Sequence, residues 1–526
     1  MSETSTSATR QIARGAGLVM AAFVLSNLVG LLRQILMTAA FGTEADMEAF
    51  NAANRVSEIL FNLLAGGALA SAFIPTFTAL LTVQNRRGAW KLASAVTNLL
   101  LVILTLASAL AAVFAPLIVR YILAPGFADD PAKTTLTIEL MRVMLPTVVI
   151  FGLSGIAMGI LNSHQSFFVP ALAPLMYQLG MIFGILALSP SMGIFGLAWG
   201  VVIGASLHLL LQIPFLTRLG GRYYTTFGLK NPDVLEVARL MGPRLLGVAV
   251  VQLNFLVNTR LASYMLEGSV TAIVLAFSLL LMPQAAIAQS IAIAALPIFS
   301  AQVALGKLDQ MRATLATSLR GILLLSVPAT MGLILLREPI IVLLYQHGEF
   351  GTYSTQLVSW TLLWFAAGLV GHAVVEIMAR SFFALHDTKT PVTVGIVAMS
   401  LNVIFSVLFS RWFTQLGWMP HGGLALANTV ATALEMVGLL ILMRRRLNGL
   451  EGQRIMRALV PACLATAAMS LVLWGWLSIS RDLAPLIIVG GGLVIGAVVY
   501  GVMLLIMGVR EARTVVRAGW SRLRKG

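Results

Sequence analysis

Polar residues interrupt the apolar segment "MEAFNAANRVSEILFNLLAGG" (47–67) at regular intervals. They follow one another in steps of three and four, which places them on one face of a helix. The stripe consists of Asn51, Asn54, Arg55, Glu58 and Asn62. One interpretation is a structural ion pair of Arg55 with Glu58 that holds helices together. A single pair does not need five polar residues, so the stripe favours a helix face that borders a hydrated cavity.

Arg33 stands in the middle of the apolar segment "SNLVGLLRQILMTAAFG" (26–42). A guanidinium group at bilayer depth costs at least about 2.5 to 3.5 kcal/mol. Its planar fork binds phosphate well, so we expect Arg33 to contact an anionic, phosphate-bearing substrate. A cross-helix ion pair with Glu48 or Glu58 is the alternative. The same stripe and its edge contain Ser26, Asn27, Gly30 and Gln34.

Polar residues in the second half of the chain suggest two further sites. Asn258 and Arg260 belong to a polar group near 252–260 and are expected to face the same cavity. Asn402 and Ser406 lie one helical turn apart and offer two oxygens to a monovalent cation, and a hydrogen bond within the core is the alternative. In "GHAVVEIMARSFFALHDTKTP" (371–391), Arg380 and Asp387 are expected to hold a turn together.

The sequence contains no pattern that indicates catalysis or metal binding. The six histidines are scattered, without the spacing of metal ligands, and the phosphate loop GxxxxGK[ST] is absent. We therefore expect a non-enzymatic protein with no cofactor, driven by the membrane potential or a monovalent cation. Cys463 is the only cysteine, which excludes an intrachain disulfide.

These segments belong to a chain of 526 residues that is 59% hydrophobic and only 10% charged. Soluble domains average about a quarter charged residues, whereas repeated apolar stretches of about 20 residues suit the bilayer core. The composition predicts an all-α polytopic membrane protein with about fourteen transmembrane helices. The predicted spans begin near Gly15, Met47, Lys91, Thr134, Phe168, Met192, Val237, Ser269, Ala313, Thr355, Pro391, Gly422, Met456 and Leu483.

The net charge of +15 is distributed unevenly between the loops. Basic residues collect after the even-numbered spans, as at 86–91 and 444–446, and in the C-terminal tail. Loops after the odd-numbered spans are acidic or nearly uncharged, as at 129–130. This alternation follows the positive-inside rule and predicts that both termini are cytoplasmic. It argues against nucleic acid as the partner.

Prolines and glycines recur at a nearly constant offset along the chain. Pro75 matches Pro297, and the offsets of the four pairs are 222, 223, 222 and 221 residues; the other pairs are Pro116 with Pro339, Gly126 with Gly348, and Pro170 with Pro391. The offset covers six spans, so the two halves share one orientation and form a parallel repeat. The predicted domains are an N-lobe (1–220), a C-lobe (221–450), and two extra helices with a basic tail (451–526).

Several segments resemble the MurJ/MviN family of lipid II flippases, in the superfamily that also includes MATE exporters and polysaccharide flippases. The resemblance covers nearly the whole chain; its segments are "SNLVGLLRQILMTAAFGTEADMEAFNAA", "GGALASAFIPTF", "APGFADD", "GILNSHQSFFVPALAP", "GLAWGVVIGASLHLLLQIP", "LYQHGEFG" and "RSFFALHDTKTPV". Arg33 matches a family arginine and Glu48 a family aspartate. The chain departs from the family where it has Asn27, Phe61 and Ser278 in place of arginines, and Ser406 near an acidic sodium ligand.

The resemblance implies a flippase of the bacterial inner membrane. Its cargo would be undecaprenyl-pyrophosphate-linked disaccharide-pentapeptide, moved to the outer leaflet by alternating access during peptidoglycan synthesis. Cell-wall synthesis proteins are expected as further partners. The rivals are a flippase for another polyprenyl-linked saccharide, a MATE-like drug exporter, a non-transporting cell-wall scaffold and, least supported, a membrane enzyme. Arg33 and Arg55 suit an anionic cargo better than the cation that a drug exporter carries.

Overall fold

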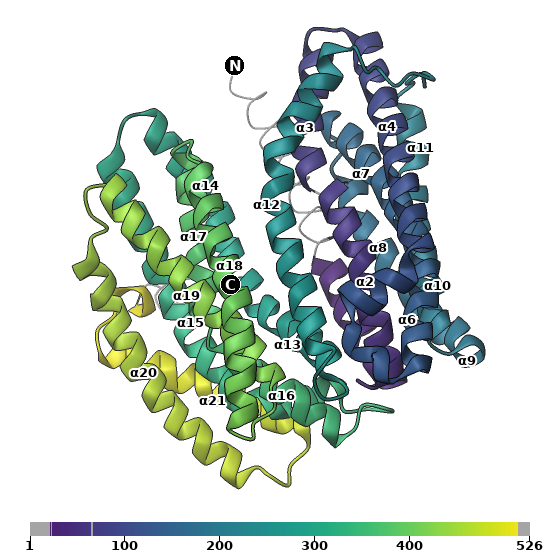
Figure 1. Ribbon diagram of the computed structural model, residues 1–526. Coiled ribbons are helices and arrows are strands. Elements are labelled where there is room, and N and C mark those ends of the chain that lie inside the picture. Colours follow the sequence, from purple (N-terminus) through teal and green to yellow (C-terminus); the bar gives the residue numbers. More distant parts are fainter. Residues whose placement is uncertain (1–21, 23, 65–66, 514–526) are drawn as a thin grey trace, which may run out of the picture. The chain divides into compact units, whose positions relative to one another are not determined.

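The computed structural model describes residues 22, 24–64 and 67–513, and helices dominate it (Figure 1). The described residues form no β-strand. They divide into two compact units. The first contains the described residues up to Val270 together with Gly348–Phe350, and the second contains Thr271–His347 and the described residues from Gly351 onward.

The first unit is a bundle of long apolar helices joined by short turns. The polar stripe of the second predicted span lies on α2, and the span continues into α3, which contains Pro75. The helices are Val24–Phe41, α2 (Ala45–Leu64), α3 (Gly67–Thr82), α4 (Arg86–Val113), α5 (Ala115–Leu117), α6 (Pro131–Met144), α7 (Pro146–Ser163), α8 (Phe168–Phe183), α9 (Ser189–Met192), α10 (Ile194–Leu210), α11 (Ile213–Arg218) and α12 (Pro232–Ala262), with irregular helical turns η1 (Ile118–Leu123), η2 (Pro125–Asp129) and η3 (Gly184–Leu188).

Glycines bring α8 and α10 into close contact. A Cβ atom added at Gly180 of α8 would lie 2.2 Å from the Cα of Gly204 on α10, and one added at Gly184 would lie 2.5 Å from the Cα of Gly200. Small residues at four-residue spacing allow two membrane helices to approach this closely. The contact fixes the position of α8, whose Met181 reaches Arg33.

The second unit is built from the remaining helices, and α13 leads into it from the first. The helices are α13 (Ser269–Gln284), α14 (Ser290–Ala304), α15 (Leu308–Tyr345), α16 (Thr352–Ala366), α17 (Leu369–Ala384), α18 (Lys389–Gln415), α19 (His421–Arg446), α20 (Gly452–Ile479) and α21 (Pro485–Ile506), with the π-helical turn η4 (Ala285–Gln289).

A proline in α15 explains how α21 is attached. Pro328 has no backbone N–H, so the carbonyl of Leu324, four residues earlier, lacks its usual helical donor. The buried hydroxyl of Tyr500 on α21 donates to this carbonyl at 2.7 Å. Arg320 and Glu511 add an ion pair at 2.6 Å. Polar contacts as well as apolar packing therefore fix α21 and the segment after it to α15, whereas α20 contributes apolar packing.

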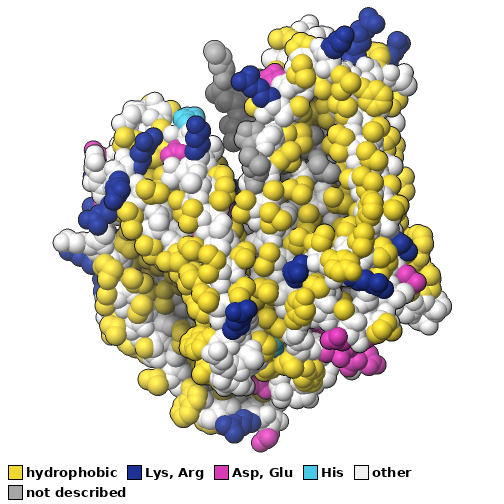
Figure 2. Space-filling view, in the orientation of Figure 1, with side chains coloured by type: hydrophobic (Ala, Val, Ile, Leu, Met, Phe, Trp, Pro, Cys, Tyr) yellow, Lys and Arg dark blue, Asp and Glu magenta, His cyan; other side chains and the backbone are white. Residues whose placement is uncertain are grey.

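The prediction of an all-α polytopic membrane protein is confirmed. Eleven described helices are long and apolar enough to cross a membrane, and two bent helix pairs raise the number to thirteen. On the first unit, hydrophobic side chains cover the flank, while Lys and Arg gather at the upper end, where α3 runs into α4 (Figure 2). The predicted start of the first span, Gly15, lies outside the described residues.

The predicted count of fourteen spans is not confirmed. The span predicted near Met47 corresponds to α2 and α3, and α2 carries Asp46, Glu48, Arg55 and Glu58. These charges make it less apolar than the other spans. The predicted domains, 1–220, 221–450 and 451–526, follow the sequence repeat. They remain predictions, because the two compact units describe packing and not the repeat.

Candidate substrate-binding site

The polar stripe of α2 forms a compact network in the first unit. Arg55 Nη1 lies 2.6 Å from Glu58 Oε2, and Asn54 Nδ2 donates to Glu58 Oε1 at 3.0 Å. The guanidinium of Arg55 also lies over the ring of Phe255 on α12, 5.0 Å from its centroid. The side chain of Glu58 remains 44% exposed and that of Arg55 16%. The pair is thus open enough for a ligand to exchange with the carboxylate.

Arg33 reaches this network from the helix Val24–Phe41. Its Nη1 donates to the sulfur of Met181 on α8 at 3.2 Å. The charges of both Arg33 and Glu58 act on Tyr177, one turn before Met181 on α8. Arg33 thus contacts α8, and both it and Glu58 are near enough to Tyr177 of this helix to act on it electrostatically. Glu48 and Glu58, the alternative partners predicted for Arg33, bind Lys133 and Arg55.

The other predicted site residues of the first unit differ in how far their side chains are exposed. Asn258 donates to Asn254 at 3.1 Å on α12, on the helix that carries Phe255. Asn51 is half-buried one turn before Arg55. Ser26 is buried and Asn27 exposed on the first helix. Of these, Asn258 and Asn51 lie on the helices that form the network.

Arg260 lies at the end of α12, where it contacts backbone. Its Nη1 donates to the carbonyl of Tyr121 in η1 at 2.5 Å, and its own carbonyl accepts a hydrogen bond from Ser263. The side chain is largely exposed. This contact gives Arg260 a role in holding η1, five residues beyond the position of Phe255.

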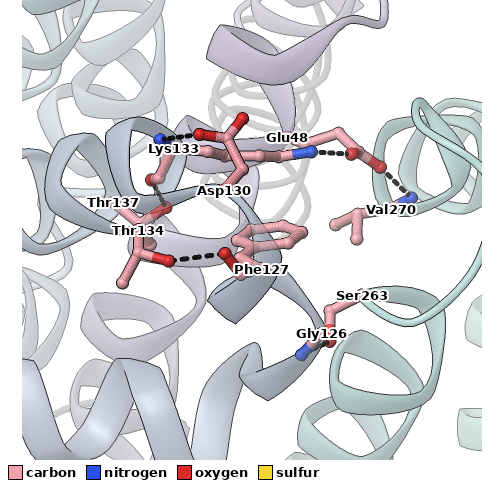
Figure 3. A network of polar contacts seen from close by, with 9 residues as sticks. All are labelled: Glu48, Gly126, Phe127, Asp130, Lys133, Thr134, Thr137, Ser263 and Val270. Carbon is pink, nitrogen blue, oxygen red and sulfur yellow. Dashed lines mark hydrogen bonds and ion pairs between the residues drawn. The ribbon is translucent and has the colours of Figure 1, made fainter.

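Glu48 occupies a second, buried polar network (Figure 3). Its Oε2 lies 2.5 Å from Lys133 Nζ of α6, and its Oε1 accepts from the backbone amide of Val270 at 2.8 Å. The ammonium of Lys133 also lies 4.3 Å from the centroid of the Phe127 ring. The side chain of Glu48 is 2% exposed. Both of its oxygens serve contacts that hold α2, α6 and the start of α13 together.

Comparisons with known proteins decide the family. The sequence model of the family described as "Lipid II flippase MurJ" matches residues 37–511. The chain belongs to the MurJ family. The lipid II flippase MurJ of Burkholderia cenocepacia is 28% identical over 510 residues, which cover 93% of this chain and 96% of that protein.

Solved structures extend the comparison to the fold. A lipid II flippase MurJ in an inward closed conformation has a TM-score of 0.80 and 24% identity, and the match covers 95% of this chain and 99% of that one. An inward-facing MATE family transporter of the MOP superfamily has a TM-score of 0.67 and 14% identity, with 83% and 99% covered. Both likenesses concern the fold.

In this MurJ family member, the predicted cation site of the second unit is a closed pair. Asn402 and Ser406 are fully buried, and Ser406 Oγ donates to Asn402 Oδ1 at 3.0 Å. The amide nitrogen of Asn402 has no hydrogen-bond partner among the described residues. The pair offers two oxygens and no carboxylate. The cation site stays a prediction, since nothing in the structure tests it.

The side chain of Asp387 helps to hold the turn after α17, and Arg380 does not contact it. Asp387 accepts hydrogen bonds from the backbone amide and the hydroxyl of Thr390, at 3.0 and 2.8 Å. Arg380 instead pairs with Glu376 at 2.6 Å within α17. The prediction that Arg380 helps to hold this turn was wrong, because a carboxylate one helical turn earlier is a nearer partner.

Three residues near the site were missed from the sequence. Lys133, which neutralises Glu48, looked like an ordinary loop lysine beside the acidic pair Asp129 and Asp130. Met181 and Tyr177 lie in an apolar stretch without a polar stripe, so no spacing signal marked them. Only the packing of α8 brings them to Arg33.

Proposed function

We propose that this protein is a lipid II flippase. The match of the MurJ family to residues 37–511 carries the proposal. The polar side chains of the first unit support it, because they include the guanidinium groups of Arg33 and Arg55 within a membrane-spanning bundle. Such a site suits the pyrophosphate of a polyprenyl-linked saccharide.

Arg33 and Arg55 are the residues that we assign to the pyrophosphate. Arg55 is already oriented by Glu58 and by the ring of Phe255, so little side-chain entropy is lost when a ligand binds. A pyrophosphate oxygen would compete with Glu58 for this guanidinium. Asn51, Asn54 and Asn258 supply neutral donors and acceptors at the edge of the site. Alternating access would then expose the site to each leaflet in turn.

The membrane potential is the energy source that we propose. Moving one charge across 100 mV is worth about 2.3 kcal/mol. Asn402 and Ser406 would contribute at most two oxygens to a monovalent cation, so any such site needs backbone carbonyls as well. We assign the protein no cofactor and no catalytic residues.

We place the protein in the bacterial inner membrane, with both termini in the cytoplasm. The alternation of basic and acidic loops supports this orientation. The cargo that we propose is the undecaprenyl-pyrophosphate-linked disaccharide-pentapeptide, and cell-wall synthesis proteins are proposed as transient partners. Drug export is less compatible with the site, because an amphiphilic cation would meet two arginines.

A depletion experiment tests the function. Bacteria depleted of their own lipid II flippase would receive the wild-type chain or the Arg33→Ala, Arg55→Ala double variant, and outer-leaflet lipid II would be measured directly. We expect the wild type alone to restore growth and outer-leaflet lipid II. A well-expressed wild type that restores neither contradicts the proposal and favours another lipid-linked cargo or a scaffold.

A further inference from the structure

Gln178 lies on α8 near Arg33 and takes no part in the Arg55–Glu58 network. A Cβ atom built at Gly30 would lie 3.2 Å from Nε2 of Gln178. Gly30 is one helical turn before Arg33 on the first helix. Met181, three residues after Gln178, contacts Arg33 itself. Gln178 therefore lies beside the first helix, about one turn, or roughly 5 Å, from the guanidinium position.

The carbonyl oxygen of Gln178 is buried and has no hydrogen-bond partner among the described residues. Buried polar atoms in proteins are nearly always paired, so an unpaired acceptor beside a polar site needs an explanation. The nitrogen of the same amide lies against Gly30, where any larger residue would crowd it. The oxygen is thus the atom of Gln178 that remains for a ligand.

The neighbours of Gln178 place this oxygen at the polar network. Tyr177, the preceding residue, is under the influence of both Arg33 and Glu58, and its ring packs edge-on against Phe151 at 5.2 Å between centroids. Arg33 contacts this segment of α8 through Met181, and Glu58 is near enough to affect Tyr177 electrostatically. A ligand held by Arg33 would extend along this segment.

We propose that Gln178 determines specificity by accepting a hydrogen bond from the sugar next to the pyrophosphate. This rests on the proposed function, since it takes Arg33 as a pyrophosphate contact. In a polyprenyl-pyrophosphate saccharide the first sugar is bonded directly to the second phosphate. A group one turn from the phosphate contact therefore meets that sugar, whose hydroxyls and acetamido N–H are donors. The amide oxygen of Gln178 is the matching acceptor.

The test compares two probes that differ only in the saccharide. Purified full-length protein in lipid nanodiscs would be titrated with lipid II and with undecaprenyl pyrophosphate, which has no sugar. For Gln178→Met, we expect about tenfold weaker binding of lipid II, the loss of one hydrogen bond, and unchanged binding of undecaprenyl pyrophosphate. For Arg33→Ala, we expect both probes to bind more weakly.

A matched control and a second variant separate recognition from folding. Gln212→Met removes another buried glutamine of the first unit, one that donates to Ser154 at 2.6 Å, and should leave the ratio of the two affinities unchanged. Gly30→Ala keeps Gln178 but crowds its amide, and should lower lipid II binding in the same direction as Gln178→Met. Gly30→Ala also keeps the inference testable if Gln178→Met does not fold.

Two results would overturn the inference. One is an equal loss for both probes in Gln178→Met, and the other is no loss for either. Failure of the proposed function would give a different result. The wild type would then bind undecaprenyl pyrophosphate, but it would not bind lipid II more tightly than this probe. In that case a preference for another polyprenyl-linked sugar that Gln178→Met abolishes would still support the role of Gln178.

Discussion

Two ion pairs of the first unit have nearly the same length and opposite surroundings. Glu48 and Lys133 lie 2.5 Å apart with side chains 2% and 9% exposed, whereas Arg55 and Glu58 lie 2.6 Å apart and Glu58 is 44% exposed. Separation alone therefore does not distinguish a structural pair from a binding site. The buried pair has no room for a ligand and holds three elements together. The open pair keeps an accessible carboxylate, which an anionic ligand would replace in the function that we propose.

The buried pair should tolerate the loss of one partner least. Lys133→Met would leave the Glu48 carboxylate buried and uncompensated, so we expect the protein to lose about 3 to 5 kcal/mol of stability. Thermal unfolding of the purified protein measures this. The double variant Lys133→Met, Glu48→Gln should recover most of the loss, because it removes both charges. Equal stability of Lys133→Met and the wild type would contradict a structural role for the Glu48–Lys133 pair.

The open pair and Arg33 should matter for transport instead. In the Arg33→Ala, Arg55→Ala double variant we expect lipid II flipping to fall by about a hundredfold, since two charge-assisted contacts to the pyrophosphate are lost. The midpoint of thermal unfolding should change far less than in Lys133→Met. A flipping assay in proteoliposomes measures the first quantity. Unchanged flipping would show that these arginines do not hold the cargo.

Removing only the charge of Glu58 should strengthen ligand binding, by a smaller factor than the loss expected for the arginine double variant. Glu58→Gln keeps a hydrogen-bond acceptor for Arg55 but removes the charge that repels phosphate. We expect undecaprenyl pyrophosphate to bind about three- to tenfold more tightly, with a stability change of less than about 1 kcal/mol. Titration in nanodiscs at low and high salt would measure it. Weaker binding would mean that the orientation of Arg55 by Glu58 matters more for the ligand than competition between the carboxylate and the phosphate.

Asp387 differs from both ion pairs, because its carboxylate accepts hydrogen bonds from the backbone amide and the hydroxyl of Thr390. The backbone amide of Thr390, with its hydroxyl and the charge of Arg446, holds the pKa of Asp387 below its usual value. Because this folded-state pKa is depressed, Asp387 stabilises the protein above its unfolded-state pKa, and the contribution disappears as the pH falls through the folded-state value. Asparagine keeps one acceptor oxygen for Thr390 and loses only the charge, so Asp387→Asn should cost less than about 1 kcal/mol at neutral pH.

The pH dependence provides the control for this last prediction. The stability difference between wild type and Asp387→Asn should shrink as the pH is lowered into the acid range where Asp387 is protonated. Thermal unfolding across that range measures it. A difference that stays constant with pH would mean that the charge of Asp387 contributes nothing to the turn.

Local pattern was enough for part of the site. The spacing of Asn54, Arg55 and Glu58 on α2 predicted a shared face, and the structure places these three in one network. The Arg55–Glu58 pair also forms, since residues three apart on a helix are neighbours, but it lies within α2 and does not join two helices. Contacts between distant segments were not predictable in this way. Lys133 is 85 residues from Glu48, and Met181 is 148 residues from Arg33.

The sequence by itself determined the class of the protein. Long apolar segments with few charges admit only membrane-spanning helices, because a helix satisfies its own backbone hydrogen bonds in lipid. It also determined which residues share a helix face. The tertiary structure decided which faces meet. Glycines allow α8 to pack closely on α10, and this packing brings Met181 to Arg33 and Tyr177 near it. Glu48 is buried and pairs with Lys133, whereas Glu58 remains partly exposed. Those outcomes depend on side-chain packing between segments far apart in the chain, which no local pattern encodes.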